Sequence, residues 1–179
     1  MSTKLSRRPN PVLFLLALLL LVVGFVRPVA ARTTEEVSHA PNSDSVRKVV
    51  YHADFADVRR FSAMLTSINN MVTTYQNQLV DYDIRIVFVA WGIRFATADK
   101  LSATPFVETP ALKARRADLL ARLSDLHEQQ GVKFEVCEIT RNQIGLDKKK
   151  LIPGATMVDS GVVRLEELQH QGFAYIKIE

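Results

Sequence analysis

The feature that most constrains the fold is a regular alternation of strand-like and helix-like segments from Val46 onward. Short β-prone runs lie at residues 47–52, 84–90, 132–137, 155–158 and 173–178, with helix-like stretches between them. Such alternation implies right-handed crossovers and a parallel sheet with helices on both faces. The sequence therefore predicts one α/β domain around a mainly parallel five-stranded sheet.

Local signals support the two longest helices and the strand between them. An apolar stripe from Val58 to Leu79 has spacings of three and four residues, typical of an amphipathic helix, and Asp57 is predicted as its N-cap. Thr109 before Pro110 predicts the start of the second helix, and Gly131 its end. The run at 84–90 is apolar after its second residue, which favours a strand covered on both faces.

The N-terminal segment, residues 1–31, has the order of a secretory signal. Three basic residues within the first eight precede an apolar run at 12–26, and Val29-Ala30-Ala31 is a small-residue cleavage site. We predict cleavage after Ala31 and a periplasmic or otherwise exported protein. The alternative is an uncleaved membrane anchor, although the apolar run is shorter than the roughly 20 residues that span a bilayer.

The charge of the chain depends strongly on this segment. The whole chain has 23 basic and 19 acidic residues, and the predicted signal carries four basic residues and no acidic one. The mature part is therefore neutral, which gives no support for nucleic-acid binding. Residues 32–45 are polar and without periodicity and are predicted to be a flexible leader, which leaves residues 46–179 for a single domain.

Cys137 is the only cysteine, so no intramolecular disulfide can form. It is a buried structural residue, a reactive thiol or an intermolecular partner. It ends a predicted strand and precedes a predicted helix start at Thr140. A helix N-terminus would stabilise the thiolate and lower the pKa of Cys137, whereas the neighbouring Glu138 would raise it.

Other candidate residues follow from the rule that sites of parallel sheets lie at the carboxyl ends of the strands. The rule selects the end after His52, the segment Trp91-Gly92-Ile93-Arg94 and the segment 137–140. Arg94 is a candidate anion ligand, with a surface arginine beside a tight turn as the alternative. Asn70 is a poor helix former in mid-helix and is expected to line the site or an oligomer interface, or to serve a structural role.

Several common catalytic classes lack support. The chain has no Walker phosphate loop, dinucleotide-binding glycine motif, nucleophile elbow or zinc-protease motif. Its four histidines are scattered without a second ligand at metal spacing. We therefore expect no metal and no cofactor.

Four short motifs, in order, resemble the DsrE/DsrF-like family. They lie at 49–52 (followed by Ile68-Asn69-Asn70), at 87–92, at 131–137 with the pattern G-V-x-φ-x-φ-C, and at 160–176. The resemblance covers essentially the whole mature domain. It implies a three-layer α/β/α sandwich that assembles as homo- or hetero-oligomers, often trimers or hexamers.

The best-understood members of that family carry sulfur as a persulfide on a cysteine, and the matching position here is Cys137. The leading hypothesis is therefore an exported sulfur-handling protein, resembling a sulfurtransferase-type carrier, that exchanges sulfane sulfur with a donor or acceptor protein. The alternatives are a non-enzymatic binding or assembly subunit with an inert, buried Cys137, and an enzyme that uses the strand-end cleft without the thiol.

Overall fold

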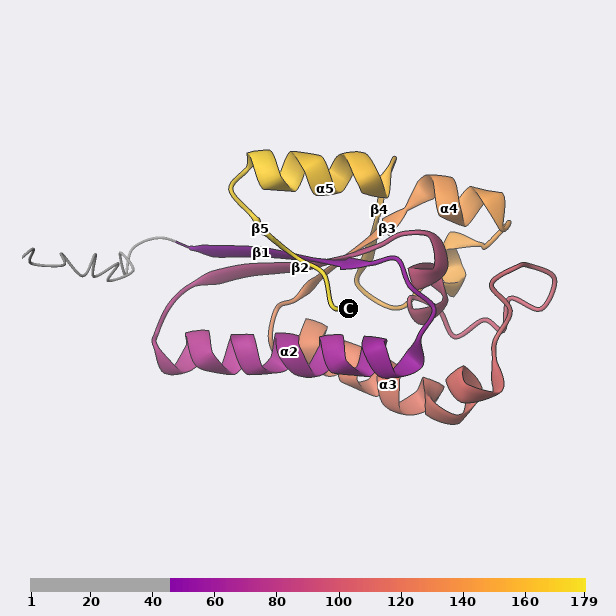
Figure 1. The fold of residues 1–179 in the computed structure, drawn as a ribbon, viewed down its shortest axis with the longest axis horizontal. Coiled ribbons are helices and arrows are strands. Elements are labelled where there is room, and N and C mark those ends of the chain that lie inside the picture. The colour runs from indigo at the N-terminus through magenta and orange to yellow at the C-terminus, as the bar shows by residue number, and fades with distance from the viewer. Residues whose placement is uncertain (1–45) are drawn as a thin grey trace, which may run out of the picture. The chain divides into compact units, whose positions relative to one another are not determined.

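The computed structural model describes residues 46–179 (Figure 1). The predicted signal, its cleavage site and the predicted leader lie outside the described residues. Within residues 46–179, no helix is long and apolar enough to cross a membrane.

The strands are β1 (Arg47–Ala53), β2 (Tyr82–Phe88), β3 (Lys133–Cys137), β4 (Ala155–Val158) and β5 (Ala174–Ile176). The helices are α2 (Val58–Asn77), α3 (Pro110–Glu128), α4 (Glu138–Gln143) and α5 (Gly161–His170), with 3-10 turns η2 (Ala90–Phe95) and η3 (Lys148–Lys150).

The five strands form one parallel sheet in the order β4-β3-β2-β1-β5. Helices α2 and α3 cover one face, and α4 and α5 lie on the other (Figure 1). The register brings the strand ends level, because Ala53 pairs with Phe88, Phe88 with Val136, and Cys137 with Val158. The predicted three-layer fold is confirmed, and all three predicted strand-end segments lie along one edge of the sheet.

The side chains of the strands alternate between two cores, as the period of a strand requires. Ile84, Ile86 and Phe88 point into the larger core beneath α2 and α3. Val87 points into a smaller core beneath α5 that also holds Cys137. Burial on both faces explains why the central strand reads as a continuous apolar run.

The predicted helix starts at the two long helices are confirmed by their caps. The Asp57 side chain accepts a hydrogen bond from the Arg60 amide (2.7 Å), and the Thr109 hydroxyl accepts one from the Leu112 amide (3.2 Å). Each cap satisfies an amide that has no partner within its helix. Residues local to each start therefore set where the two helices begin.

Two predicted boundaries at the site were wrong. Helix α4 begins at Glu138 rather than Thr140, because Cys137 itself takes the extended N-cap conformation (φ −64°, ψ 117°). The strand predicted to reach Ala90 ends at Phe88, because Ala90 adopts a positive φ of 46° and opens η2.

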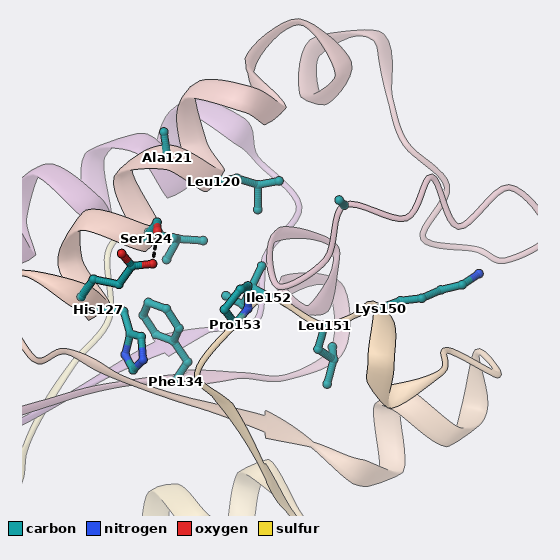
Figure 2. A pocket seen from close by; sticks show the side chains of 12 residues that line it. Leu120, Ala121, Ser124, His127, Phe134, Lys150, Leu151, Ile152 and Pro153 are labelled. Atoms are coloured by element: carbon teal, nitrogen blue, oxygen red, sulfur yellow. Dashed lines mark hydrogen bonds between the residues drawn. The ribbon is translucent and has the colours of Figure 1, made fainter.

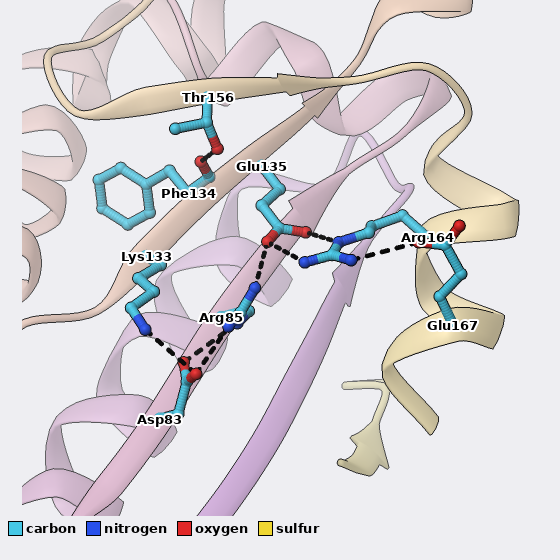
Figure 3. A network of polar contacts seen from close by, with 8 residues as sticks. All are labelled: Asp83, Arg85, Lys133, Phe134, Glu135, Thr156, Arg164 and Glu167. Atoms are coloured by element: carbon cyan, nitrogen blue, oxygen red, sulfur yellow. Dashed lines mark hydrogen bonds and ion pairs between the residues drawn. The ribbon is translucent and has the colours of Figure 1, made fainter. Parts of the chain in front are cut away.

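A charged network joins α5 to the sheet (Figure 3). Glu135 on β3 accepts hydrogen bonds from Arg85 on β2 (2.8 Å) and from two nitrogens of Arg164 on α5 (2.7 and 3.0 Å). Arg85 also pairs with Asp83, and Arg164 with Glu167. Because the Glu135 carboxylate bridges two cations from different elements, it fixes α5 over β3.

Candidate functional site

Cys137 lies where two helices begin. It is the last residue of β3 and the N-cap of α4, and only 4% of it is exposed. The first residue of α5, Gly161, lies against it: a methyl group added to Gly161 would be 2.5 Å from Val89 Cγ2 and 3.1 Å from Cys137 Cβ. Only glycine allows α5 to start this close to the cysteine.

The surroundings of the thiol favour its charged form. Burial raises the pKa of Cys137, but the backbone amides of Thr140, Gly161 and Ile139 and the Thr140 hydroxyl act in the opposite direction. The net result is a pKa below the ordinary value for cysteine. Among the described residues the Cys137 side chain makes no capping hydrogen bond to α4, so these donors act on the thiolate mainly through the orientation of their dipoles.

Glu138 does not oppose this effect as strongly as its place in the sequence suggests. A hydrogen bond from Arg141 (2.7 Å), aided by Lys148, lowers the pKa of Glu138 to about 2. The carboxylate is therefore paired with cations on its own side of α4. Its charge is largely compensated before it reaches the Cys137 sulfur.

Thr140 connects the two neighbouring strand ends. Its buried hydroxyl accepts a hydrogen bond from the Ala90 amide (3.1 Å), which holds the start of η2 against α4. The same residue supplies an amide and a hydroxyl near Cys137. The structure places Thr140 near the thiol, inside the first turn of α4 rather than at its start, and its predicted role in the site stays a prediction.

Replacing Thr140 with valine is expected to raise the pKa of Cys137 by about one pH unit. A hydrogen-bond donor to a charged group contributes roughly 1.5–3 kcal/mol, and we take the lower end of this range because the Thr140 hydroxyl is only one of several donors near the thiol. The measurement is the ultraviolet absorbance of the thiolate against pH, which has a single source since Cys137 is the only cysteine. Thr156→Val is the matched control, because the Thr156 hydroxyl bonds the Phe134 carbonyl instead (3.0 Å). Equal titration curves for both variants would contradict the assignment.

The segment predicted from Trp91 to Arg94 forms η2, and its side chains separate by role. Gly92 packs directly on β1, since an added methyl group would lie 1.8 Å from the Ala53 carbonyl oxygen. Trp91 is 42% exposed and packs edge-on against Phe106. The Arg94 guanidinium carbon lies 5.0 Å from the centre of the Trp91 ring, and only 3% of Arg94 is exposed. The alternative prediction, that Arg94 is a surface residue beside a tight turn, is therefore wrong.

The structure does not bring Asn70 to the thiol. Asn70 is exposed on α2, in the layer on the other side of the sheet, and its carbonyl accepts a bond from Thr74 (2.9 Å). Its neighbour Asn69 accepts a hydrogen bond from Gln130 (2.8 Å). His52, at the first strand end, lies 2.8 Å from the Tyr175 hydroxyl. Within residues 46–179, no three potential ligands cluster as a metal site would require.

A groove of about 390 Å³ lies between β4 and the first turns of α5, and Cys137 is not among its lining residues. Val158, the register partner of Cys137, and Ser160, the N-cap of α5, line it. Arg164 and Glu167 line its far part. The groove offers a small molecule an approach to the start of α5.

A second cavity, of about 370 Å³, lies away from the thiol between α3 and the chain that leads into β4 (Figure 2). Its polar groups already have partners: the Ser124 hydroxyl donates to Glu128 (2.7 Å), and His127 Nδ1 lies 2.9 Å from the Val132 carbonyl oxygen. The rest of the lining is mainly apolar and includes Leu120, Leu123, Phe134, Ile152 and Pro153. None of the predicted site residues lines this cavity.

Sequence reasoning missed two parts of the strand-end region. The Ser160-Gly161 pair signals a helix start, but nothing in the sequence places that start against Cys137, 24 positions earlier. Arg116 on α3 donates to the carbonyl oxygen of Arg94 (3.1 Å) and went unnoticed because it lies on the exposed-looking face of a helix. Both contacts are long-range and depend on the assembled fold.

The family match and the structural match to MTH1491 agree with this architecture. Residues 53–178 match the DsrE/DsrF-like family. A solved structure of the protein of unknown function MTH1491 from Methanobacterium thermoautotrophicum is similar, with 25% identity, a TM-score of 0.56, and coverage of 74% of this chain and 99% of that one. The ychN protein from E. coli aligns with 14% identity, a TM-score of 0.42, and coverage of 74% and 100%. No curated protein matches the chain.

Proposed function

Because this chain belongs to the DsrE/DsrF-like family, we propose that Cys137 accepts, holds and passes on a sulfane sulfur atom as a persulfide. The observation that carries the proposal is the position of the only thiol among amide donors at the starts of α4 and α5. A persulfide is an anion at neutral pH, so the donors that lower the pKa of Cys137 also stabilise its loaded form. The groove lined by Ser160 ends next to Gly161, which contacts Cys137, and would hold a small donor at the start of α5.

The transfer is a thiol exchange in two steps. The Cys137 thiolate attacks the sulfane sulfur of a persulfide or thiosulfonate, a new sulfur–sulfur bond forms, and the donor's own sulfur–sulfur bond breaks. The electron pair leaves with the remainder of the donor, as a thiolate or sulfinate. A thiolate on the acceptor then attacks the outer sulfur of the persulfide, and Cys137 leaves again as a thiolate.

Sulfur loading tests the proposal directly. We expect the purified protein to gain the mass of one sulfur atom after incubation with polysulfide or thiosulfate, and to lose it on reduction. Cys137→Ser should gain nothing, and prior alkylation of Cys137 should abolish the gain. Undiminished loading in either case would place the sulfur elsewhere and sink the proposal.

The burial of Cys137 supports a second candidate, an assembly or binding subunit whose thiol is inert. Only 4% of Cys137 is exposed, while apolar Ile139, Val162 and Val163 are more than half exposed on α4 and α5. Such exposed apolar residues favour a homo-oligomer, and the resemblance to the family implies a trimer or hexamer. Slow native reaction of the thiol with a maleimide, fast reaction after unfolding and an oligomeric mass in light scattering, without sulfur loading, would favour this candidate.

We also propose that the protein is exported, on the basis of residues 1–31. The test is to express the chain with residues 1–31 in a bacterial host and to determine the N-terminal sequence and the location of the product. A periplasmic product that begins at Arg32 would support cleavage after Ala31. A membrane-bound product that retains its first residues would favour the anchor instead.

A further inference from the structure

Arg94 is a buried cation without a counter-ion. Only 3% of the residue is exposed, and its Nε atom is enclosed without a hydrogen-bond partner. Within residues 46–179, its guanidinium donates no hydrogen bond, and no carboxylate lies within ion-pairing distance of it. Its guanidinium carbon lies 5.0 Å from the centre of the Trp91 ring.

This state is energetically costly. A buried charge ordinarily needs a partner and hydrogen bonds, because desolvation of an ion costs several kcal/mol. The two arginines of the network at Glu135 satisfy that rule with carboxylates on both sides. Arg94 has no such carboxylate, so its donors are free to meet an anion that comes from outside the chain.

A second guanidinium strengthens the case. Arg116 donates to the carbonyl oxygens of Arg94 and Thr97, and pairs with Glu108 (2.6 Å). Its Nη2 atom is nevertheless buried without a partner. Burial, and then repulsion from Arg116, lower the pKa of Arg94. Two cations and one carboxylate leave a net positive charge there, together with N–H donors that have no partner among residues 46–179.

The chemistry of these donors selects a class of ligand. Guanidinium groups present planar pairs of N–H donors that match the oxygens of sulfonate, sulfate, phosphate or carboxylate. Arg94 follows β2 at the same edge of the sheet where Cys137 ends β3, and the Ala90–Thr140 hydrogen bond joins these two strand ends. An anion on Arg94 would therefore lie at the edge that holds the thiol.

We propose that Arg94, assisted by Arg116, binds the sulfonate end of a thiosulfate-class donor. The inference rests on the proposed sulfur transfer and names the substrate class for it. The Cys137 thiolate attacks the outer sulfur of thiosulfate, a sulfur–sulfur bond forms, and the bond to the sulfonate sulfur breaks. Its electron pair leaves on that sulfur as sulfite, so that charge and electrons balance without an oxidant.

Trp91 provides a readout of anion binding that does not depend on sulfur chemistry. It is the only tryptophan, and its ring lies against Arg94. In a Cys137→Ser background, thiosulfate and sulfate should change its fluorescence saturably, with chloride at equal ionic strength giving no saturable change. Phosphate and acetate, titrated in the same way, define which oxyanions the site accepts.

Variants of Arg94 sharpen this binding test. Arg94→Gln should weaken thiosulfate binding at least about tenfold, because it removes charge-assisted hydrogen bonds. Arg94→Lys keeps the charge but loses the planar pair of N–H donors, so its affinity for thiosulfate should lie between those of the parent and Arg94→Gln. Arg59→Gln, on the exposed part of α2, is the matched control and should bind as the parent does. In the absence of oxyanions Arg94→Gln should melt no lower than the parent, and only the parent should gain stability on adding thiosulfate.

A second measurement addresses the donor itself, in chains that keep Cys137. The ratio of the sulfur-loading rate from thiosulfate to that from polysulfide should fall at least about tenfold in Arg94→Gln and stay unchanged in Arg59→Gln. If the parent loads from no donor, the proposed function fails while the fluorescence titration still decides the anion site. Unaltered binding in Arg94→Gln, an unchanged loading ratio, or no saturable response to any oxyanion would overturn the inference.

Discussion

Glu135→Ala is expected to lower the free energy of unfolding by about 3 kcal/mol, since removing one partner of a buried ion network leaves uncompensated charge. The carboxylate is 7% exposed and is bonded to Arg85 and Arg164. We place the effect at the lower end of the usual range because Asp83 and Glu167 still pair with those arginines. Urea denaturation measures it.

The same substitution should disturb the thiol. Arg164 loses its bonds to β3, so the start of α5 is held less firmly over the sheet, and we expect the Gly161 amide to shift relative to Cys137. We expect the pKa of Cys137 to rise in Glu135→Ala. Glu166→Ala is the control, because that carboxylate is 60% exposed and pairs only with His170 on the same helix. A loss of stability in the control equal to that of Glu135→Ala would show that helix α5, rather than the network, is responsible.

The effect of Glu135 should also depend on pH. Burial raises the pKa of Glu135, but hydrogen bonds from Arg164 and Arg85 lower it more, so its pKa in the folded protein lies below the usual range. A carboxyl group with a depressed pKa stabilises the fold above its unfolded pKa, near about 4.3, and loses that contribution as pH falls through the folded value. The stability difference between parent and Glu135→Ala should therefore be constant near neutral pH and shrink in acid.

Gly92→Ala is expected to cost about 3 kcal/mol of stability, the upper part of the range for overpacking. The new methyl group would lie 1.8 Å from the Ala53 carbonyl oxygen and 2.5 Å from its carbon. Both atoms belong to the backbone at the end of β1, so no side chain can turn aside to make room. The strand end or η2 must move, which would displace Trp91 and Arg94.

Gly131→Ala separates this clash from the general cost of losing a glycine. Gly131 has a positive φ of 68° with no atom within 4 Å of an added methyl group. Its replacement should cost only the left-handed backbone penalty, roughly 1–2 kcal/mol. Equal effects in the two variants, measured by thermal and urea unfolding, would show that the packing of η2 on β1 tolerates a side chain.

The order and type of the elements follow from the sequence because their signals are local. Apolar spacing, the caps Asp57 and Thr109, and the apolar run of β2 concern residues within one or two turns of each other. Parallel pairing then follows from the alternation of strands and helices. The two wrong boundaries were the end of β2, predicted at Ala90, and the start of α4, predicted at Thr140. The positive φ of Ala90 and the capping position of Cys137 depend on contacts between elements, which local signals do not report.

By itself, the sequence determined that this chain folds as a parallel α/β domain and that its one cysteine ends a strand. Only the tertiary structure decided what surrounds that thiol. It placed the start of α5 against Cys137, turned Arg94 inward without a carboxylate partner among residues 46–179, and left Asn70 in the opposite layer. The physical reason is range: periodicity and capping act between neighbours in sequence, whereas burial and charge pairing depend on residues that the sheet brings together.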